Sequence, residues 1–438
     1  MKKSYLTRVM LLVIFILLAL TLNVQAATTP GLEDVYPGRE YFFAKGTPIT
    51  ISARTDSQPG ATITWEGGSL NVGPDAYIFG GMHNDDTAVT SSITMNGGNV
   101  KHIAGGGLHL SNTTTSNVTI NGGNVNYVAG GGVGSGATIG QKCTAPTCDG
   151  FAQESDATQA KCKTGTTNVT VTGGTVTCVY GGGLSGVTKT TAANVKMSGG
   201  SVEYVVGGVS NGYTGTANVK VTGGTATYVQ SVNRGTMDSA NMSVTGGNVT
   251  NLFVGGENDS SVTGTINDVK LTVSENATVG TLSYGYNGGT DIDPTTGNIT
   301  AEDVKVSGNA NVGNKDALAN TVTTTYAVTI DGKVYTLEAG KTIKDIPGYD
   351  ALITRDGSDF AGFVSNGTMF DPNTVINANV EMKTAFAPKA APASPAQSAP
   401  TVVEAEKDNT PKTGIDNLSA YATIIAMISL MGIIIIKK

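Results

Sequence analysis

The stretch Val118-Thr119-Ile120-Asn121-Gly122-Gly123 is one copy of a unit that recurs through the middle of the chain. Each copy is a short β-branched segment followed by a polar residue and a Gly-Gly pair. The copies lie at residues 63–68, 93–98, 118–123, 169–174, 195–200, 219–224 and 242–247, with degenerate copies near 269–276 and 304–309. A repeat of about 25 residues rich in β-branched side chains predicts a β-solenoid in which each copy adds one coil.

Alternation with a period of two predicts which side chains stack when the coils lie on one another. The first strand of each copy is expected to give an inward apolar column and an outward Thr/Lys face. The apolar column comprises Ile93, Val118, Val169, Val195, Val219, Met242, Val269 and Val304. The Thr/Lys face comprises Thr119, Thr170, Lys196, Lys220 and Lys270.

Two more columns follow from the same alignment. An internal asparagine ladder is predicted at Asn117, Asn168, Asn194, Asn218 and Asn241, with Asp268 and Asp303 at this position in the last coils. Stacked amides can donate to one neighbour and accept from the other. The second strand gives a column of His102, Tyr127, Cys178, Tyr204 and Tyr228. We interpret this column as packing rather than as a ligand platform, although the sequence leaves its direction open.

Composition bounds the class of protein that this 438-residue chain can be. It has 59 glycines without the three-residue period of collagen, and only 14% of its residues are charged. The net charge of −7 argues against nucleic acid or an anionic membrane surface as a partner. Together with the repeat, these values predict an all-β protein built on a right-handed parallel β-helix.

The first residues have the pattern of a secretory signal peptide. Lysines and an arginine precede an apolar core from Val9 to Leu20, and Val24-Gln25-Ala26 offers a cleavage site before Ala27. We therefore expect a signal helix at residues 1–26, cleaved between Ala26 and Ala27. Cap strands are expected at residues 27–60, and the solenoid at residues 61–320 with an insertion at 134–166.

The C-terminus carries Thr410-Pro411-Lys412-Thr413-Gly414, an apolar run from Leu418 to Ile436 and two final lysines. The run is about long enough to cross a bilayer as a transmembrane helix, and the lysines would hold its end in the cytoplasm. This segment, 410–438, resembles the Leu-Pro-X-Thr-Gly-type sorting signal of Gram-positive cell-wall proteins, with Thr410 in place of the usual Leu. The resemblance implies that a sortase cleaves after Thr413 and joins its carboxyl group to peptidoglycan.

Two segments separate the repeats from the sorting signal. Residues 321–386 contain an Asp331-Gly332 hairpin turn, the run Leu337-Glu-Ala-Gly-Lys-Thr-Ile343 and a closing strand that ends at Phe386. This segment resembles the small β-grasp B-repeat of internalin-type surface proteins, although Gly362-Phe363 stands where that family usually has Gly-Trp. The resemblance implies a spacer or weak binding unit. Residues 387–409 are rich in Ala and Pro, so we expect an extended linker through the cell wall.

The four cysteines lie close together in the sequence, at Cys143, Cys148, Cys162 and Cys178. An oxidising exterior permits pairing, with three possible connectivities. Of these we favour Cys143 with Cys148 and Cys162 with Cys178. A zinc site is the alternative, but the spacing fits no common zinc pattern and the chain has only three histidines.

The sequence offers little sign of catalysis. Acidic residues of the repeat region are scattered over different loops, and no nucleophile motif is present. Asp85-Asp86, Glu257-Asn-Asp259 and Asp291-Ile-Asp293 offer oxygen ligands for calcium, although solvated loop charge is the favoured interpretation. We predict a non-enzymatic, cofactor-free cell-surface adhesin that binds an extracellular glycan or protein through the Thr/Lys face or the insertion. The alternatives are a passive spacer or coat protein, or a β-helix enzyme that degrades polysaccharide.

Overall fold

A computed structural model describes most of the chain between the two ends. It describes residues 29–134, 162–184, 188–210, 212–233, 235–256, 258–259, 262–263, 265–274, 276–287, 291–293, 298–314 and 322–389. The chain divides into two compact units, Met1–Pro388 and Lys389–Lys438, and of the second only Lys389 is described. The described part contains no helix that is both long and apolar enough to cross a bilayer.

The described chain is all-β apart from two short helical turns, η3 (Ile343–Asp345) and α2 (Tyr349–Leu352). The strands up to the end of the repeats are β1 (Gly31–Glu33), β2 (Tyr41–Phe43), β3 (Ile49–Ala53), β4 (Ala61–Trp65), β5 (Gly68–Val72), β6 (Tyr77–Phe79), β7 (His83–Met95), β8 (Asn99–Ala104), β9 (Leu108–Ile120), β10 (Asn124–Ala129), β11 (Cys162–Val171), β12 (Thr175–Tyr180), β13 (Thr188–Met197), β14 (Ser201–Val206), β15 (Gly212–Gln230), β16 (Thr236–Phe253), β17 (Asn258–Asp259), β18 (Val262–Thr263), β19 (Thr265–Val273), β20 (Ala277–Ser283), β21 (Gly285–Asn287), β22 (Asp291–Asp293), β23 (Asn298–Ser307) and β24 (Asn311–Asn314). The strands that follow are β25 (Val322–Ile330), β26 (Lys333–Glu338), β27 (Ser358–Ser365), β28 (Thr368–Phe370) and β29 (Val380–Pro388).

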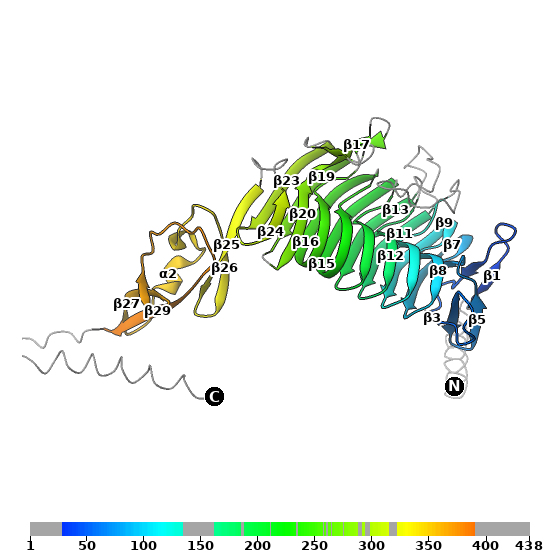
Figure 1. Ribbon diagram of the computed structural model, residues 1–438, viewed down its shortest axis with the longest axis horizontal. Coiled ribbons are helices and arrows are strands. Elements are labelled where there is room, and N and C mark those ends of the chain that lie inside the picture. The colour runs from blue at the N-terminus through cyan, green and yellow to red at the C-terminus, as the bar shows by residue number, and fades with distance from the viewer. Residues whose placement is uncertain are drawn as a thin grey trace, which may run out of the picture. The chain divides into compact units, whose positions relative to one another are not determined.

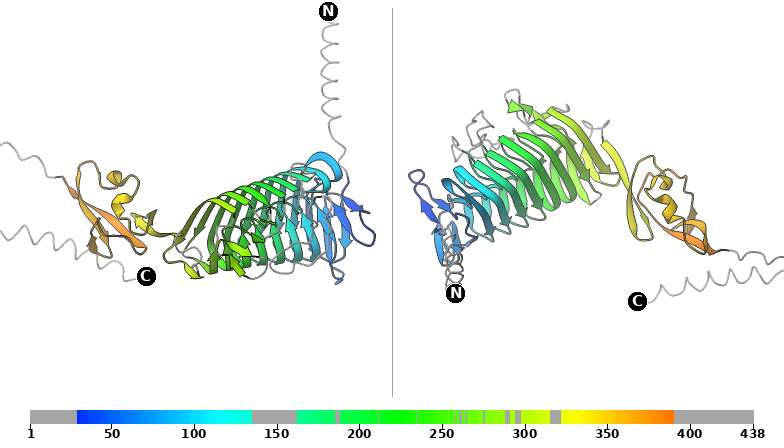
Figure 2. Two further views of the ribbon diagram at one scale, coloured as in Figure 1. Left: turned by 90° about the horizontal axis from the view of Figure 1, so that it is seen from above. Right: turned by 180° about the vertical axis from the view of Figure 1, so that it is seen from behind.

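Two parallel ladders run through the repeat region, and each coil adds one rung to both (Figure 1). The first ladder contains, in order, β3, β7, β9, β11, β13, β15, β16, β19, β23 and β25. The second contains β2, β6, β8, β10, β12, β14, β15, β16, β20 and β24. Figure 2 shows the same stack of coils from above and from behind. The predicted all-β class with a long parallel sheet is confirmed, and its architecture is solenoid-like.

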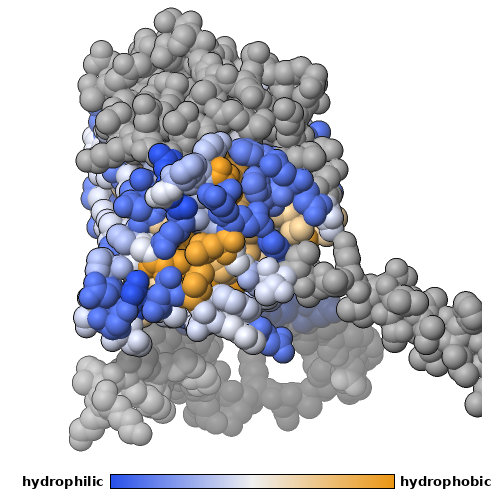
Figure 3. All heavy atoms as spheres, turned by 90° about the vertical axis from the view of Figure 1, so that its right-hand side faces the viewer, coloured by the Kyte–Doolittle hydropathy of each residue, from blue (hydrophilic) through white to orange (hydrophobic). Residues whose placement is uncertain are grey.

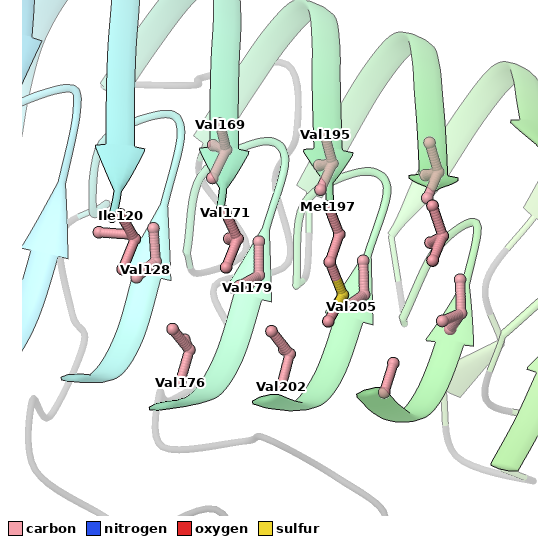
Figure 4. Close-up of a cluster of buried hydrophobic side chains, with 14 of the residues drawn as sticks. Ile120, Val128, Val169, Val171, Val176, Val179, Val195, Met197, Val202 and Val205 are labelled. Atoms are coloured by element: carbon pink, nitrogen blue, oxygen red, sulfur yellow. The ribbon is translucent and has the colours of Figure 1, made fainter. Parts of the chain in front are cut away.

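The core lies between the two ladders (Figure 4). Val169 and Val171 of the first ladder point toward Val176 and Val179 of the second, and all four side chains are at most 1% exposed. The next coil repeats this arrangement with Val195, Met197, Val202 and Val205. Because each coil covers the apolar side of its neighbour, the core is continuous along the stack and the coils stabilise one another.

The predicted register holds for most coils and is wrong for one. Val219 pairs with Met242, as expected, but Met242 pairs with Leu271 rather than with Val269. Leu271 in turn pairs with Val304. Val269 lies two residues earlier, opposite Ala240, and is still fully buried. A shift of two residues keeps every side chain on its face, so the alternation could not exclude it.

Because of the same shift, the predicted positions of two outward side chains, Lys270 and Asp268, are wrong. Lys270 pairs with Asn241 and not with the Thr/Lys face, where Thr272 takes its place. Asp268 lies opposite Ser239, outside the asparagine column, whereas Asp303 pairs with Lys270 and so lies in that column.

The asparagine ladder is confirmed in five consecutive coils. The Nδ2 atoms of Asn168, Asn194, Asn218 and Asn241 each donate to the Oδ1 atom of the preceding asparagine, at 2.8 to 3.0 Å. The prediction that the ladder is internal is wrong, because its side chains are half-buried and the last one is exposed. Each amide acts as donor and acceptor, so the ladder fixes the register of neighbouring coils at the surface.

The aromatic column of the second ladder is confirmed and faces inward. Tyr77, His102, Tyr127, Cys178 and Tyr204 are paired in series, and each is at most 5% exposed. Apart from His102, they belong to a second buried cluster, separate from the core between the ladders. Tyr228, the last residue of the predicted column, is half-buried and packs against this cluster. Tyr41 extends the column by stacking on Tyr77 with ring centroids 4.9 Å apart. The column is therefore a packing element, as we interpreted it.

The copy at residues 63–68 does not form a coil, contrary to the prediction. Strand β4 pairs antiparallel with both β3 and β5, and Glu66-Gly67 is the two-residue turn of the β4–β5 hairpin. In this turn the first glycine, Gly67, has the positive φ of +85°. In the coil copies the second glycine has it, as Gly123 does. The same Gly-Gly sequence therefore forms part of a hairpin here and a corner of a coil elsewhere.

Strand β25 belongs both to the last coil and to the C-terminal segment. Its first residues, from Val322, pair with β23 in parallel, and its later residues, to Ile330, pair antiparallel with β26. Its end also pairs in parallel with β29, which pairs antiparallel with β27. These strands and the helical turns enclose a third buried cluster that includes Phe363 and Met382.

Candidate functional site

Several of the predicted sites lie outside the described residues. These are the cleavage site at Ala26 and Ala27, the sorting motif Thr410-Pro411-Lys412-Thr413-Gly414, most of the insertion, and Cys143 and Cys148. Cys178 is disulfide-bonded and fully buried in the aromatic column. The backbone of Cys162 begins β11, but its side chain is not described, so the predicted pairing of Cys162 with Cys178 stays a prediction.

The Thr/Lys face exists as a continuous outward row. Pairing joins Thr94, Thr119, Thr170, Lys196, Lys220, Ser243, Thr272 and Lys305 in that order. Lys196 and Lys220 are exposed, whereas the threonines at the N-terminal end of the row are half-buried. The row thus offers hydroxyl groups at one end and ammonium groups further along, spaced by the distance between strands, about 4.8 Å.

Of the predicted calcium ligands, only the side chain of Asp85 is described. The Thr87 side chain and, at 2.8 Å, the backbone N–H of Thr87 both donate to the Asp85 carboxylate, and these hydrogen bonds lower the pKa of Asp85. Within the described ranges no group of three metal-ligating side chains is found. The side chains of Asp86, Glu257, Asp259, Asp291 and Asp293 are not described.

A pocket that the sequence did not predict lies beside the N-terminal strands. Its volume is about 530 Å³. Gly38, Arg39, Glu40, Gly73, Pro74, Asp75, Tyr77 and Lys101 line it. Three successive levels of the second ladder supply these residues, because Tyr41, Tyr77 and His102 are paired in series. No single motif carries the site, which is why it could not be read from the repeat.

The pocket places two cations above one aromatic ring. Arg39 Cζ is 6.0 Å and Lys101 Nζ is 5.7 Å from the ring centroid of Tyr77. Lys101 Nζ is also 3.5 Å from Asp75 Oδ1, a carboxylate whose side chain is 87% exposed. The second carboxylate, Glu40, accepts a hydrogen bond from the backbone N–H of Gly73 at 2.5 Å. This arrangement suits binding of a polar ligand with an acidic group.

Apolar surface is found at the same end of the molecule. Figure 3 shows a hydrophobic patch among hydrophilic side chains on the end that carries the N-terminal strands. Leu32 and Tyr36, in this part of the chain, are 47% and 42% exposed. The ring of Tyr36 packs on Tyr41, with centroids 5.9 Å apart, and Tyr41 stacks on Tyr77 of the pocket. Polar and apolar groups therefore lie close together here.

An ionic cluster next to this end fixes β1 to the first long strand. Glu33 contacts Lys45 Nζ at 2.8 Å and His83 Nδ1 at 2.9 Å. Burial alone would raise the pKa of Glu33, but the hydrogen bonds from Lys45 and His83 outweigh burial and lower it. The His83 ring also stacks on Phe43. Because Lys45 and His83 both contact the Glu33 carboxylate, we interpret the cluster as structural.

His102 makes the stability of this end dependent on pH. Burial lowers the pKa of His102 to about 3, and neither ring nitrogen has a hydrogen-bond partner among the described residues. Between pH 6.5 and 3 the unfolded chain therefore binds a proton that the folded chain does not, so stability falls as the pH falls. We expect His102→Phe to remove up to about 1.4 kcal/mol per pH unit of this loss.

The measurement is thermal unfolding of the wild type and of His102→Phe from pH 7 to pH 4. Tyr127→Phe is the control, because it alters the same column without removing a group that titrates in this range. Parallel pH curves for the wild type and His102→Phe would contradict the expectation.

Comparison with known proteins gives no relative. No family model, no curated protein and no solved structure matches the chain.

Proposed function

We propose that the chain is a non-enzymatic surface protein of a Gram-positive bacterium. A signal peptide exports it, a sortase anchors it to peptidoglycan through Thr413, and the stacked coils are presented outside the wall as an adhesin. Its ligand is an extracellular glycan or protein. The sequence patterns at both ends support export and anchoring, and the long polar faces of the stack support display.

The proposal includes the finer description of the fold. We assign the stack to a right-handed β-solenoid of about 25 residues per coil, and residues 321–386 to a β-grasp-like module. The strand order β26-β25-β29-β27, with its two central strands parallel, supports the second assignment.

The observation that best supports a tethered role is the path of the chain between the stack and the C-terminal segment. Strand β25 enters from the last coil and β29 leaves toward the C-terminus, and the two pair in parallel at Val328–Ile330 and Val380–Met382. A pull on the two ends therefore loads these hydrogen bonds in shear, all at once. A molecule held at one end and bound at the other needs a connection of this kind.

Anchoring is tested by expressing the full chain in a Gram-positive host and digesting the purified wall with a muralytic enzyme. Mass spectrometry should find a C-terminal peptide that ends at Thr413 and carries a peptidoglycan fragment. Pro411→Ala should release the protein into the medium or the membrane fraction, whereas Lys412→Ala, at the variable position of the motif, should not. Wild-type protein that stays in the cytoplasm would overturn the proposal.

The alternative is a passive coat protein, which is favoured by the half-buried, self-paired side chains that cover much of the stack. A screen of the full chain against glycan arrays and extracellular-matrix proteins separates the two. Reproducible binding supports the adhesin, and absence of any binding supports the coat. Release of sugars from polysaccharide would instead support the alternative of a polysaccharide-degrading enzyme.

A further inference from the structure

We propose that the pocket lined by Arg39, Asp75, Tyr77 and Lys101 binds an acidic sugar, that is, a sugar ring with one carboxylate. This inference rests on the proposed adhesive function and names the class of ligand. The volume of about 530 Å³ lies within the range of ligand pockets and exceeds the needs of a small inorganic ion.

The two cations provide the carboxylate subsite. The Arg39 guanidinium and the Lys101 ammonium both line the pocket, each within about 6 Å of the Tyr77 ring centroid, so each can contact an anion bound there. The Asp75 carboxylate at 3.5 Å from Lys101 is strongly exposed, and such a pair contributes little to stability. A ligand carboxylate can therefore replace Asp75 as the partner of Lys101 at small cost.

The carboxylates of the pocket argue for a sugar rather than for phosphate. Asp75 and Glu40 would repel a dianion, but each can accept hydrogen bonds from sugar hydroxyl groups. The Tyr77 side chain is 1% exposed, and its hydroxyl has no hydrogen-bond partner in the described part of the chain. A buried polar group without a partner is costly, and a ligand hydroxyl or carboxylate oxygen would satisfy it.

An exposed aromatic ring lies close to the pocket. Tyr36 is 42% exposed and is linked to Tyr77 through the stacked ring of Tyr41. Carbon–hydrogen faces of sugar rings pack on such surfaces, whereas simple anions gain nothing from them. An exposed ring, two cations and two hydrogen-bond acceptors together fit an acidic sugar better than they fit a neutral sugar or a simple anion.

The test uses the full chain and soluble probes, with binding measured by ligand-observed NMR and calorimetry. Glucuronate and N-acetylneuraminate represent acidic sugars of glycans outside the bacterium, and N-acetylmuramic acid represents the bacterial wall. Which of these binds most tightly distinguishes the two sources. Glucose tests the need for the carboxylate, and inorganic phosphate tests for a simple anion site.

We expect at least one acidic sugar to bind, and Lys101→Gln and Arg39→Gln each to weaken it about tenfold or more, because each loses one charge-assisted contact. Tyr36→Ala should weaken binding of the sugar but not binding of a free carboxylate such as acetate. Lys189→Gln, which changes an exposed lysine on β13, should leave binding unchanged.

Absence of binding by all three acidic sugars, equal binding of glucose, or tighter binding of phosphate would overturn the assignment. These outcomes are distinct from failure of the adhesin proposal. A chain that binds a neutral glycan or a matrix protein through another face would refute only the pocket.

Discussion

Replacing Gly181 with alanine should open the stack in its centre. A Cβ atom at this position would lie 2.0 Å from the backbone oxygen of Gly207 in the next coil and 2.8 Å from Val195 Cγ2. The first contact is with backbone, which cannot rotate away as a side chain can. The Gly181 carbonyl also accepts a hydrogen bond from Thr167 Oγ1, which holds Gly181 in place.

The expected cost is about 3 kcal/mol, the upper range for overpacking of a well-packed interior. A stack of repeats does not unfold in one step, so the effect should be local. Hydrogen exchange followed by mass spectrometry should show strands β12 and β14 exchanging about a hundredfold faster, while β7 and β9 change little. Gly31→Ala is the control, because a Cβ there meets no atom of the described residues within 4 Å. Unchanged exchange in β12 and β14 would contradict the close stacking described above.

Removing the Asp331 carboxylate should weaken the C-terminal segment against force more than against heat. At one end of the β25–β29 pair, Asp331 accepts hydrogen bonds from Thr384 N–H at 3.1 Å and from Thr384 Oγ1 at 2.6 Å. At the other end, Asn379 Oδ1 accepts one from the Ala327 N–H at 2.9 Å. These side chains extend the short parallel pairing, and in shear they carry load together with it.

We expect Asp331→Ala and Asn379→Ala each to raise the unfolding rate of this segment at constant force about tenfold, equivalent to about 1.4 kcal/mol at the barrier. The measurement is force-clamp spectroscopy on the full chain, with handles attached near residues 29 and 389. Asp345→Ala is the matched control. It removes the acceptor of two hydrogen bonds from Thr342, in the same segment but outside the loaded pair.

The control separates shear resistance from ordinary stability. Asp345→Ala should lower the melting temperature of the segment by an amount similar to that for Asp331→Ala, yet leave its lifetime under force unchanged. Equal shortening of the lifetime by both variants would refute the role of the β25–β29 pair as the element that resists force.

Periodicity allowed much of the fold to be predicted, because stacking leaves each column little choice of neighbours. The apolar column, the aromatic column and the asparagine ladder followed from the alignment of Gly-Gly pairs alone. The alignment went wrong where those pairs are lost. In the coil of Leu271 no Gly-Gly marks the corner, and Val269 and Leu271 fit an inward position equally well.

Prediction from the local sequence was also wrong where tertiary context determines the structure. Residues 63–68 match the repeat but are followed directly by β5, so the chain turns back at Glu66-Gly67 and pairs antiparallel. The pocket was missed for a different reason. Arg39, Asp75 and Lys101 come from three successive levels of the second ladder, and an alignment of the Gly-Gly pairs does not bring these residues together. None of the three belongs to a recognisable motif.

The central claim is that successive coils stack in parallel with one outward row of side chains. Genetically encoded spin labels at Thr94 and Lys220, and at Thr94 and Lys305, test it by pulsed electron paramagnetic resonance without altering the cysteines. Pairing places these residues four and seven steps apart in the row. At about 4.8 Å per step we expect about 19 and 34 Å. A Thr94–Lys305 distance no longer than the Thr94–Lys220 distance would contradict the stack.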